Sequence, residues 1–242
     1  MEMDTCKNCY EPVNGNYCSN CGQPAKLRRI DIHYVLSEIG DFFLANKGMI
    51  YTIKKILINP GESVRRFISE DRYRFVKPIT FLLITSLLFT LVNHIFKIDY
   101  LTQYNNTSQT QMRTMSQISR WILENRGYAA IIIGLLMAFW LKLFFRKSGY
   151  NLFEIFILLC FVSGITSVWM SVVSFFQGIL HLNLLMGSIL VSLIYHFWAI
   201  GQFFDGKKAV SYIKAILSWV VGVMAICIIL SIVAVIEFIV RY

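Results

Sequence analysis

From Pro78 to the last residue, long apolar runs follow one another with only short polar segments between them. The hydrocarbon core of a bilayer is about 30 Å thick, so a helix needs roughly 20 apolar residues to cross it. Five runs reach or approach this length. The sequence therefore predicts an all-α membrane protein, a five-span helical bundle, with spans at residues 78–96, 127–145, 152–180, 182–204 and 213–240.

The overall composition agrees with a membrane protein. Of the 242 residues, 56% are hydrophobic and only 15% are charged, whereas soluble domains contain about 25% charged residues. The net charge of +9 would also suit a nucleic-acid-binding protein, but 12 of the 23 Lys and Arg residues lie at or before Lys77, just ahead of the first run. The positive-inside rule explains basic residues at that place, so nucleic-acid binding is not expected.

The distribution of Lys and Arg between the loops predicts the orientation of the chain. With a cytoplasmic N-terminus, 18 of these residues lie on the cytoplasmic side and 5 outside. Because the bias holds in all three cytoplasmic segments, we expect the N-terminus inside and the C-terminus outside. The loop 97–126 then faces outward, and its residues 112–123 are expected to form a short surface helix.

Ahead of the spans lie two Cys-x-x-Cys pairs, Cys6 with Cys9 and Cys18 with Cys21. Each pair presents two thiolates from one turn, and two pairs complete a tetrahedral site, while Gly22 relieves the turn after the last cysteine. Because protein sulfur fills every coordination position, we expect structural Zn²⁺, with iron or redox-active thiols as alternatives. Residues 1–25 are then a small zinc ribbon that cannot fold without its metal.

Residues 26–77 are basic, and their apolar residues recur at helical spacing over 32–43 and again over 50–57. These juxtamembrane amphipathic helices are expected either to lie in the headgroup layer of an anionic membrane or to pack on the cytoplasmic ends of the spans. The basic residues expected at the membrane surface are Lys54, Lys55, Arg65 and Arg66.

Polar residues inside the spans mark candidate sites because each is costly in lipid. His196 lies deepest and is expected to make a structural hydrogen bond, with a proton or ion pathway as the alternative. Glu154 is expected to reach His196 or Lys142. Serines recur every four residues on the third span, which favours close helix packing over a stripe lining a pore. The candidate intramembrane polar site comprises Glu154, His196, Ser163, Ser167 and Ser171.

A set of residues within about the first 95 positions carries a family resemblance: Cys21-Gly22-Gln23, Lys47-Gly48, Thr52, Asn59-Pro60-Gly61, Arg65-Arg66-Phe67-Ile68, Arg72 and Pro78. On these residues the chain resembles a family of bacterial multi-pass membrane proteins of unknown function with an N-terminal zinc ribbon. The family often has Gly-Lys-Arg where this chain has Glu70-Asp71-Arg72. The resemblance implies a location in the bacterial inner (cytoplasmic) membrane and brings no activity with it.

The sequence contains no phosphate-binding glycine loop, zinc-protease motif or serine-hydrolase motif, so we do not expect an enzyme. The leading hypothesis is a non-enzymatic scaffold or regulator in an anionic bilayer, whose cytoplasmic zinc ribbon docks a cytoplasmic protein partner. The alternative is a homo-oligomeric channel or pore-forming effector, linked to bacterial immunity by analogy with small multi-pass proteins of immune loci.

Overall fold

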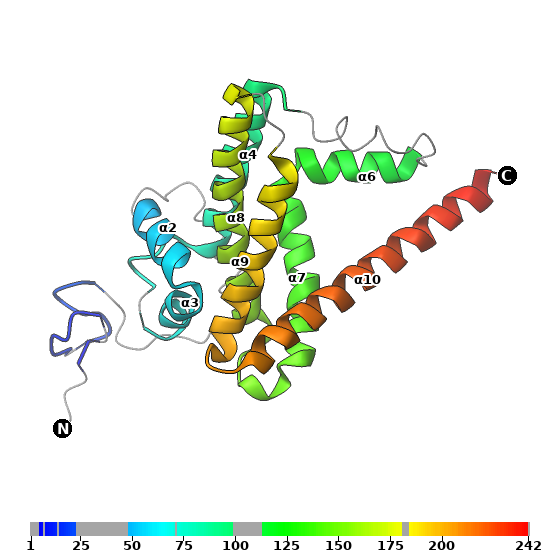
Figure 1. The fold of residues 1–242 in the computed structure, drawn as a ribbon. Coiled ribbons are helices and arrows are strands. Elements are labelled where there is room, and N and C mark those ends of the chain that lie inside the picture. Colours follow the sequence, from blue (N-terminus) through cyan, green and yellow to red (C-terminus); the bar gives the residue numbers. More distant parts are fainter. Residues whose placement is uncertain are drawn as a thin grey trace.

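The computed structural model describes residues 5–6, 8–13, 15–22, 48–70, 72–98, 113–180 and 184–241. After the N-terminal ribbon the described chain is almost entirely helical (Figure 1). A 3₁₀ turn, Arg146–Ser148, follows α7. The α-helices are α2 (Met49–Ile58), α3 (Pro60–Ser69), α4 (Pro78–Phe96), α6 (Arg113–Glu124), α7 (Arg126–Phe144), α8 (Leu152–Leu180), α9 (Leu185–Asp205) and α10 (Ala209–Arg241).

Five of these helices, α4, α7, α8, α9 and α10, are long and apolar enough to cross a membrane. This result confirms the predicted all-α, five-span bundle. Helix α8 is central in the bundle. In its most apolar stretch of 18 residues, 78% of the residues are buried, compared with 17% to 39% in the corresponding stretches of the other four helices. The other spans therefore expose apolar side chains on their outer sides, as helices do when lipid surrounds them.

The observed helix bounds lie close to the predicted spans. Helices α4 and α8 begin and end at the predicted residues, α7 is shifted by one residue, and α10 begins four residues earlier than predicted. Pro78 occupies the first turn of α4, where its missing N–H is not needed. The predicted surface helix is α6. The amphipathic stretch at 32–43 and the turn at His181 lie outside the described residues.

Helices α4 and α7 pack along different parts of α8. Gly164 and Gly178 of α8 lie against the rings of Phe81 and Phe96 of α4. By contrast, α7 approaches α8 nearer its N-terminal end, at Phe156. With 29 residues, α8 is about 43 Å long at 1.5 Å per residue, which is enough for two shorter helices to pack on it at different heights.

Helices α2 and α3 pack on the bundle beside the N-terminal part of α8 (Figure 1). The ring of Phe67 is fully buried and meets Phe161 of α8 edge to face, with 5.2 Å between centroids. Ile56 and Val64 are fully buried in the same core. Of the two arrangements predicted for this region, packing on the spans is therefore present for α2 and α3.

Helix α3 meets the C-terminal end of α9 backbone to backbone. A Cβ on Gly61 would overlap the main chain of Gln202 and Phe203, and Gly61 N donates to Gln202 Oε1 at 2.8 Å. The Arg65 guanidinium donates to the carbonyl oxygens of Gln202 and, at 2.8 Å, of Phe203. The last carbonyls of a helix have no partner in their own helix and attract a cation. Arg65 thus caps α9.

Helix α2 is fixed at both ends by contacts with the rest of the chain. Gly48, which precedes it, has a φ of 102°, a value that glycine adopts without strain. Thr52 is fully buried, and its Oγ1 accepts a hydrogen bond from Val76 N at 3.0 Å. At the other end, Tyr195 Oη of α9 donates to Ile56 O at 2.8 Å. These contacts fix α2 relative to both α4 and α9.

We predict that Gly61→Ala will destabilise the folded protein by roughly 1–3 kcal/mol, because the new methyl group overlaps the main chain of α9. The thermal midpoint of the full chain in mild detergent measures this effect. Gly187→Ala is the matched control, since a Cβ there meets nothing within 4 Å. Alanine favours the helix by up to about 1 kcal/mol, so the control should not lose stability. Equal midpoints for the two variants would contradict the close contact.

We also predict that Arg65→Ala will cost roughly 1.5–3 kcal/mol, because charge-assisted hydrogen bonds to α9 are lost. The neighbouring Arg66→Ala provides the comparison. Arg66 is exposed, and its ion pair with Glu62 at 3.3 Å is a surface contact, so its loss should cost less than about 1 kcal/mol. If both substitutions lowered the midpoint equally, the assignment of Arg65 as the cap would be wrong.

Candidate functional site

The cysteines Cys6, Cys9, Cys18 and Cys21 form a compact cluster. Their four Sγ atoms all lie within 4.8 Å of one another. The distance is 3.5 Å between the Sγ atoms of Cys6 and Cys21 and between those of Cys9 and Cys18. A tetrahedral zinc ion with Zn–S bonds of 2.3 Å would separate its sulfur ligands by about 3.8 Å. The four side chains are therefore placed to bind one metal ion.

The two halves of the cluster share one backbone turn. In each half, the carbonyl of the first cysteine accepts a hydrogen bond at 2.9 Å from the N–H four residues later, Tyr10 N to Cys6 O and Gly22 N to Cys18 O. The residue after the second cysteine is left-handed, with a φ of 63° at Tyr10 and 72° at Gly22. Glycine takes this conformation freely, as predicted for Gly22, whereas tyrosine takes it at a cost.

The thiols of the cluster differ in acidity. A hydrogen bond from the backbone of Cys9 lowers the pKa of Cys6 to about 6, and one from the backbone of Cys21 lowers the pKa of Cys18. For Cys9 a backbone bond from Glu11 also lowers the pKa, but burial and the adjacent thiols raise it to about 12. Four thiolates this close repel one another, so a bound metal cation would favour the release of the remaining protons.

The ribbon has a small interior and exposes two large aromatic side chains. Among its described residues, Val13 is buried together with Cys6 and Cys18. Tyr10 is 81% exposed and Tyr17 is 68% exposed. Each tyrosine adjoins a cysteine of the cluster. Exposed tyrosines are enriched at protein interfaces, where the ring packs and the hydroxyl remains hydrogen-bonded.

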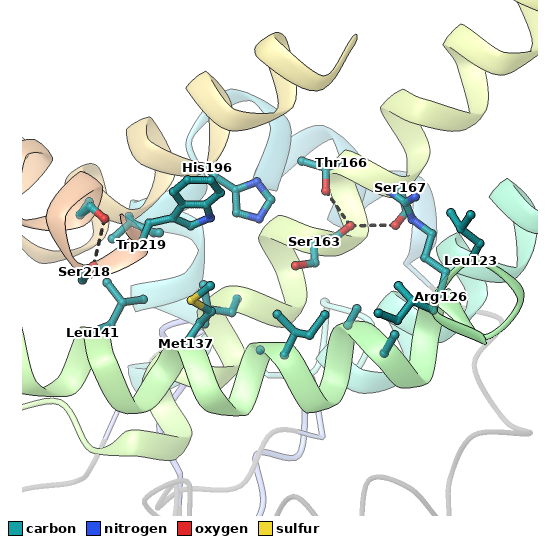
Figure 2. A pocket seen from close by; sticks show the side chains of 18 residues that line it. Leu123, Arg126, Met137, Leu141, Ser163, Thr166, Ser167, His196, Ser218 and Trp219 are labelled. Atoms are coloured by element: carbon teal, nitrogen blue, oxygen red, sulfur yellow. Dashed lines mark hydrogen bonds between the residues drawn. The ribbon is translucent and has the colours of Figure 1, made fainter. Parts of the chain in front are cut away.

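A cavity of about 300 Å³ lies between α7, α8, α9 and α10, with α6 at one end (Figure 2). Three residues of the predicted intramembrane site line it: Ser163, Ser167 and His196. Thr166 and Ser218 also contribute polar side chains. Most of the remaining wall is aliphatic or aromatic. The predicted polar residues therefore border an apolar chamber.

Hydroxyl groups in the cavity wall are largely engaged by their own helices. Thr166 Oγ1 and Ser167 Oγ both donate to Ser163 O at 2.9 Å (Figure 2). Ser218 Oγ likewise donates to a carbonyl of α10 at 2.9 Å. Such bonds satisfy the hydroxyl proton locally and leave oxygen lone pairs as acceptors.

His196 makes a local hydrogen bond of the kind that was predicted for it. Its Nδ1 lies 3.1 Å from Ser192 O. A carbonyl oxygen only accepts, so in the neutral ring Nδ1 carries the proton and Nε2 is an acceptor. Its environment is thus a helix carbonyl on one side and the cavity on the other.

Arg126 also lines the cavity, although its sequence position placed it in the outer loop. Its guanidinium lies 4.2 Å from the centroid of the Phe89 ring. Phe89 is the twelfth of the 19 residues of α4, and the adjacent Gly127 packs against Ser86 of the same helix. The charge therefore lies beside the middle third of α4. Sequence reasoning missed it because neither apolar run reveals how the two helices are staggered.

Two members of the predicted intramembrane site lie outside the cavity wall. Glu154 Oε2 accepts from Asn151 N at 2.7 Å, while Glu154 N donates to Asn151 Oδ1 at 2.8 Å. This reciprocal pair is a capping box that begins α8, and the expected approach of Glu154 to His196 stays a prediction. Ser171 is buried and donates to Ser167 O at 2.7 Å, as expected for packing.

Lys142, the other partner that was considered for Glu154, donates a hydrogen bond to Tyr150 O. Burial raises the pKa of the Tyr150 hydroxyl; the positive charge of Arg65 opposes this shift and the negative charge of Glu154 adds to it. Its ring packs on Phe203 of α9, with 4.5 Å between centroids. The turn before α8 and the capped end of α9 thus form one polar junction.

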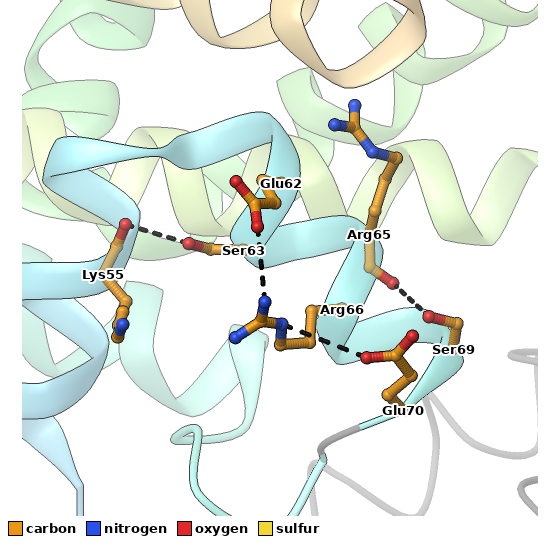
Figure 3. Close-up of polar contacts among 7 residues, drawn as sticks. All are labelled: Lys55, Glu62, Ser63, Arg65, Arg66, Ser69 and Glu70. Atoms are coloured by element: carbon orange, nitrogen blue, oxygen red, sulfur yellow. Dashed lines mark hydrogen bonds and ion pairs between the residues drawn. The ribbon is translucent and has the colours of Figure 1, made fainter. Parts of the chain in front are cut away.

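The four basic residues predicted at the membrane surface divide into two groups. Lys54, Lys55 and Arg66 are exposed. Figure 3 shows Arg66 beside Glu62, with Arg65 extending from another side of α3. The prediction for Arg65 is corrected, because its guanidinium is engaged by the carbonyls of α9. A helical repeat places consecutive residues about 100° apart, so neighbouring arginines face different surroundings.

Comparison with known proteins gives one match. The profile of a family described as "Protein of unknown function (DUF3667)" matches residues 46–90, which comprise α2, α3 and most of α4. No curated protein and no solved structure matches the chain. The matched segment contains Gly48, Thr52, Gly61 and Arg65, the residues that hold α2 and α3 on the bundle. This similarity, the five apolar helices and the cysteine cluster together fit an uncharacterised multi-pass membrane family.

Proposed function

We propose that this chain is a non-enzymatic membrane scaffold or regulator whose N-terminal ribbon docks a protein partner in the cytoplasm. The observation that carries the proposal is the exposure of Tyr10 and Tyr17, at 81% and 68%, beside a cluster whose four sulfurs all point to one another. A cluster closed by protein ligands leaves no open position for chemistry on a substrate. The exposed surface of the ribbon is then the part that is available to bind other molecules.

The metal that suits this cluster best is structural Zn²⁺. Four thiolates in a tetrahedral arrangement favour zinc or iron, and zinc is the usual ion in small ribbons that lack a hydrophobic core. The described interior of the ribbon, with Val13 beside the ligands, is too small to stabilise a fold without such an ion. Metal binding would thus present the two tyrosines on a rigid support.

The bacterial inner membrane, with the ribbon on the cytoplasmic side, is the location that we propose. Support comes from the 23 Lys and Arg residues, which are concentrated in the segments on the ribbon's side of the membrane. The outer face of α2 agrees with contact to anionic lipid, because Ile50 and Leu57 are 83% and 51% exposed next to the exposed Lys54 and Lys55. Such a face suits the headgroup layer.

The alternative, a channel or pore in a homo-oligomer, receives less support. A pore lined by the serines of α8 needs hydroxyls that face water. Instead, Ser167 and Ser171 are buried and donate to carbonyls of their own helix at 2.9 and 2.7 Å. Ser163 and Ser167 do border the cavity, but with a largely apolar wall around them.

We predict that Cys9→Ser will abolish stoichiometric zinc binding and make residues 1–25 sensitive to protease, because a three-sulfur site holds the metal too weakly to fold the ribbon. Metal analysis of the purified chain, with limited proteolysis, measures both effects. Cys227→Ser is the matched control, since Cys227 is exposed and lies outside the cluster. Full zinc occupancy and an unchanged cleavage pattern in Cys9→Ser would contradict a structural metal site.

We predict that replacing Tyr10 and Tyr17 together by Asn will reduce recovery of cross-linked cytoplasmic proteins about tenfold, as expected when interface anchors are lost. Asparagine tolerates the positive φ of Tyr10, so the ribbon should keep its fold and its zinc. Tyr73→Asn is the control, because Tyr73 is 69% exposed but lies outside the ribbon. Quantitative mass spectrometry of the cross-linked membranes gives the comparison. The docking proposal fails if the double variant and the Tyr73→Asn control yield the same cross-linked proteins in the same amounts.

A further inference from the structure

Charge is unevenly distributed in the cavity between α7, α8, α9 and α10. Among the described residues that line it, Arg126 alone carries a formal charge at neutral pH. Figure 2 shows Arg126 and Leu123 at one end and His196 and Trp219 toward the other. The hydroxyl protons of Thr166, Ser167 and Ser218 are used within their own helices. The strongest hydrogen-bond donor of the cavity is therefore at one end.

The position of Arg126 favours an anion beside it. Its guanidinium carbon lies over the Phe89 ring, 4.2 Å from the centroid, and this cation–π contact helps to hold the charged group at that end of the cavity. Carboxylate and phosphate groups bind guanidinium through its N–H edge, so this contact and anion binding are compatible. Arg126 is also the first residue of α7, where the positive end of the helix dipole adds to the attraction.

The rest of the cavity suits a hydrocarbon. Away from Arg126 its wall is formed by side chains such as Ile133, Met137, Leu141 and Ile200. Its volume of about 300 Å³ is at the lower end of the range for small-molecule sites. A sugar or peptide would bury polar groups that these apolar walls cannot satisfy, and a cation would be repelled by Arg126. An elongated apolar molecule with one anionic end matches both features.

We propose that this cavity binds an anionic amphiphile, with its oxyanion head group held by Arg126 and a hydrocarbon chain against α7 and α10. A long-chain fatty acid is the simplest molecule with this chemistry, and an anionic phospholipid presents the same combination of groups. The assignment is independent of the role of the ribbon, because none of the residues on which it rests belongs to the ribbon.

The test is quenching of Trp219 fluorescence by brominated ligands in the full-length protein, reconstituted in nanodiscs of neutral phosphatidylcholine. The probes are 9,10-dibromostearate, its methyl ester and a brominated phosphatidic acid, and Trp219→Phe defines the signal from the cavity. We expect saturable quenching by the acid and at least about tenfold weaker apparent affinity for the ester, because the charge-assisted bond to Arg126 is lost.

Arg126→Gln should weaken binding of the acid about tenfold, whereas Arg120→Gln, an exposed arginine of α6 outside the cavity wall, should not change it. Saturable quenching by the phosphatidic acid, with the same dependence on Arg126, would identify a membrane lipid as the source. Equal affinities for acid and ester in the unmodified chain would overturn the proposal without any variant. Inorganic phosphate that displaces the acid at millimolar concentration would also overturn it, since the site would then recognise a small anion.

Discussion

The last turn of α9 presents carbonyl oxygens that its own helix cannot satisfy. Arg65 supplies a donor, and it reaches the carbonyls of Gln202 and Phe203 because Gly61 lets the two backbones approach closely. This contact holds α3 on the bundle. The hydrogen bond from Val76 N to Thr52 Oγ1 of α2 then fixes where α4 begins, two residues after Val76. The residues with these roles lie within the family-matched segment 46–90, so the similarity coincides with the part of the chain that sets the bundle's geometry.

The place at which α4 begins also affects where α7 lies in the bundle. Helix α4 covers the C-terminal part of α8, and α2 with α3 packs beside its N-terminal part. Helix α7 therefore starts beside the middle of α4, as the contact of Gly127 with Ser86 shows. Because of this stagger, Arg126, which was predicted to lie in a loop, lies in the wall of an apolar cavity. A cation is costly there unless it has compensating contacts, such as the contact with the Phe89 ring.

Features that depend on one segment could be predicted from the sequence, and features that depend on the placement of two segments could not. The length of an apolar run defines a span, and the spacing of Cys6, Cys9, Cys18 and Cys21 defines a cluster, so both were found. The sequence did not predict that Arg65 and Arg66 have different environments, because these depend on which side of α3 meets α9. The capping box of Glu154 is local and was recognisable, since Asn151 precedes it by three residues at the start of α8.

The two candidate sites have one property in common. In the ribbon, the four thiols are directed at one another, so a bound metal ion would have a complete set of protein ligands. In the cavity, the hydroxyls of Thr166 and Ser167 donate to a carbonyl of their own helix. What each site presents is a surface: the exposed Tyr10 and Tyr17 in one case, and the Arg126 guanidinium at the end of an apolar chamber in the other. Surfaces of this kind select partners by shape and charge, which is consistent with a protein that binds and positions other molecules in and at the membrane.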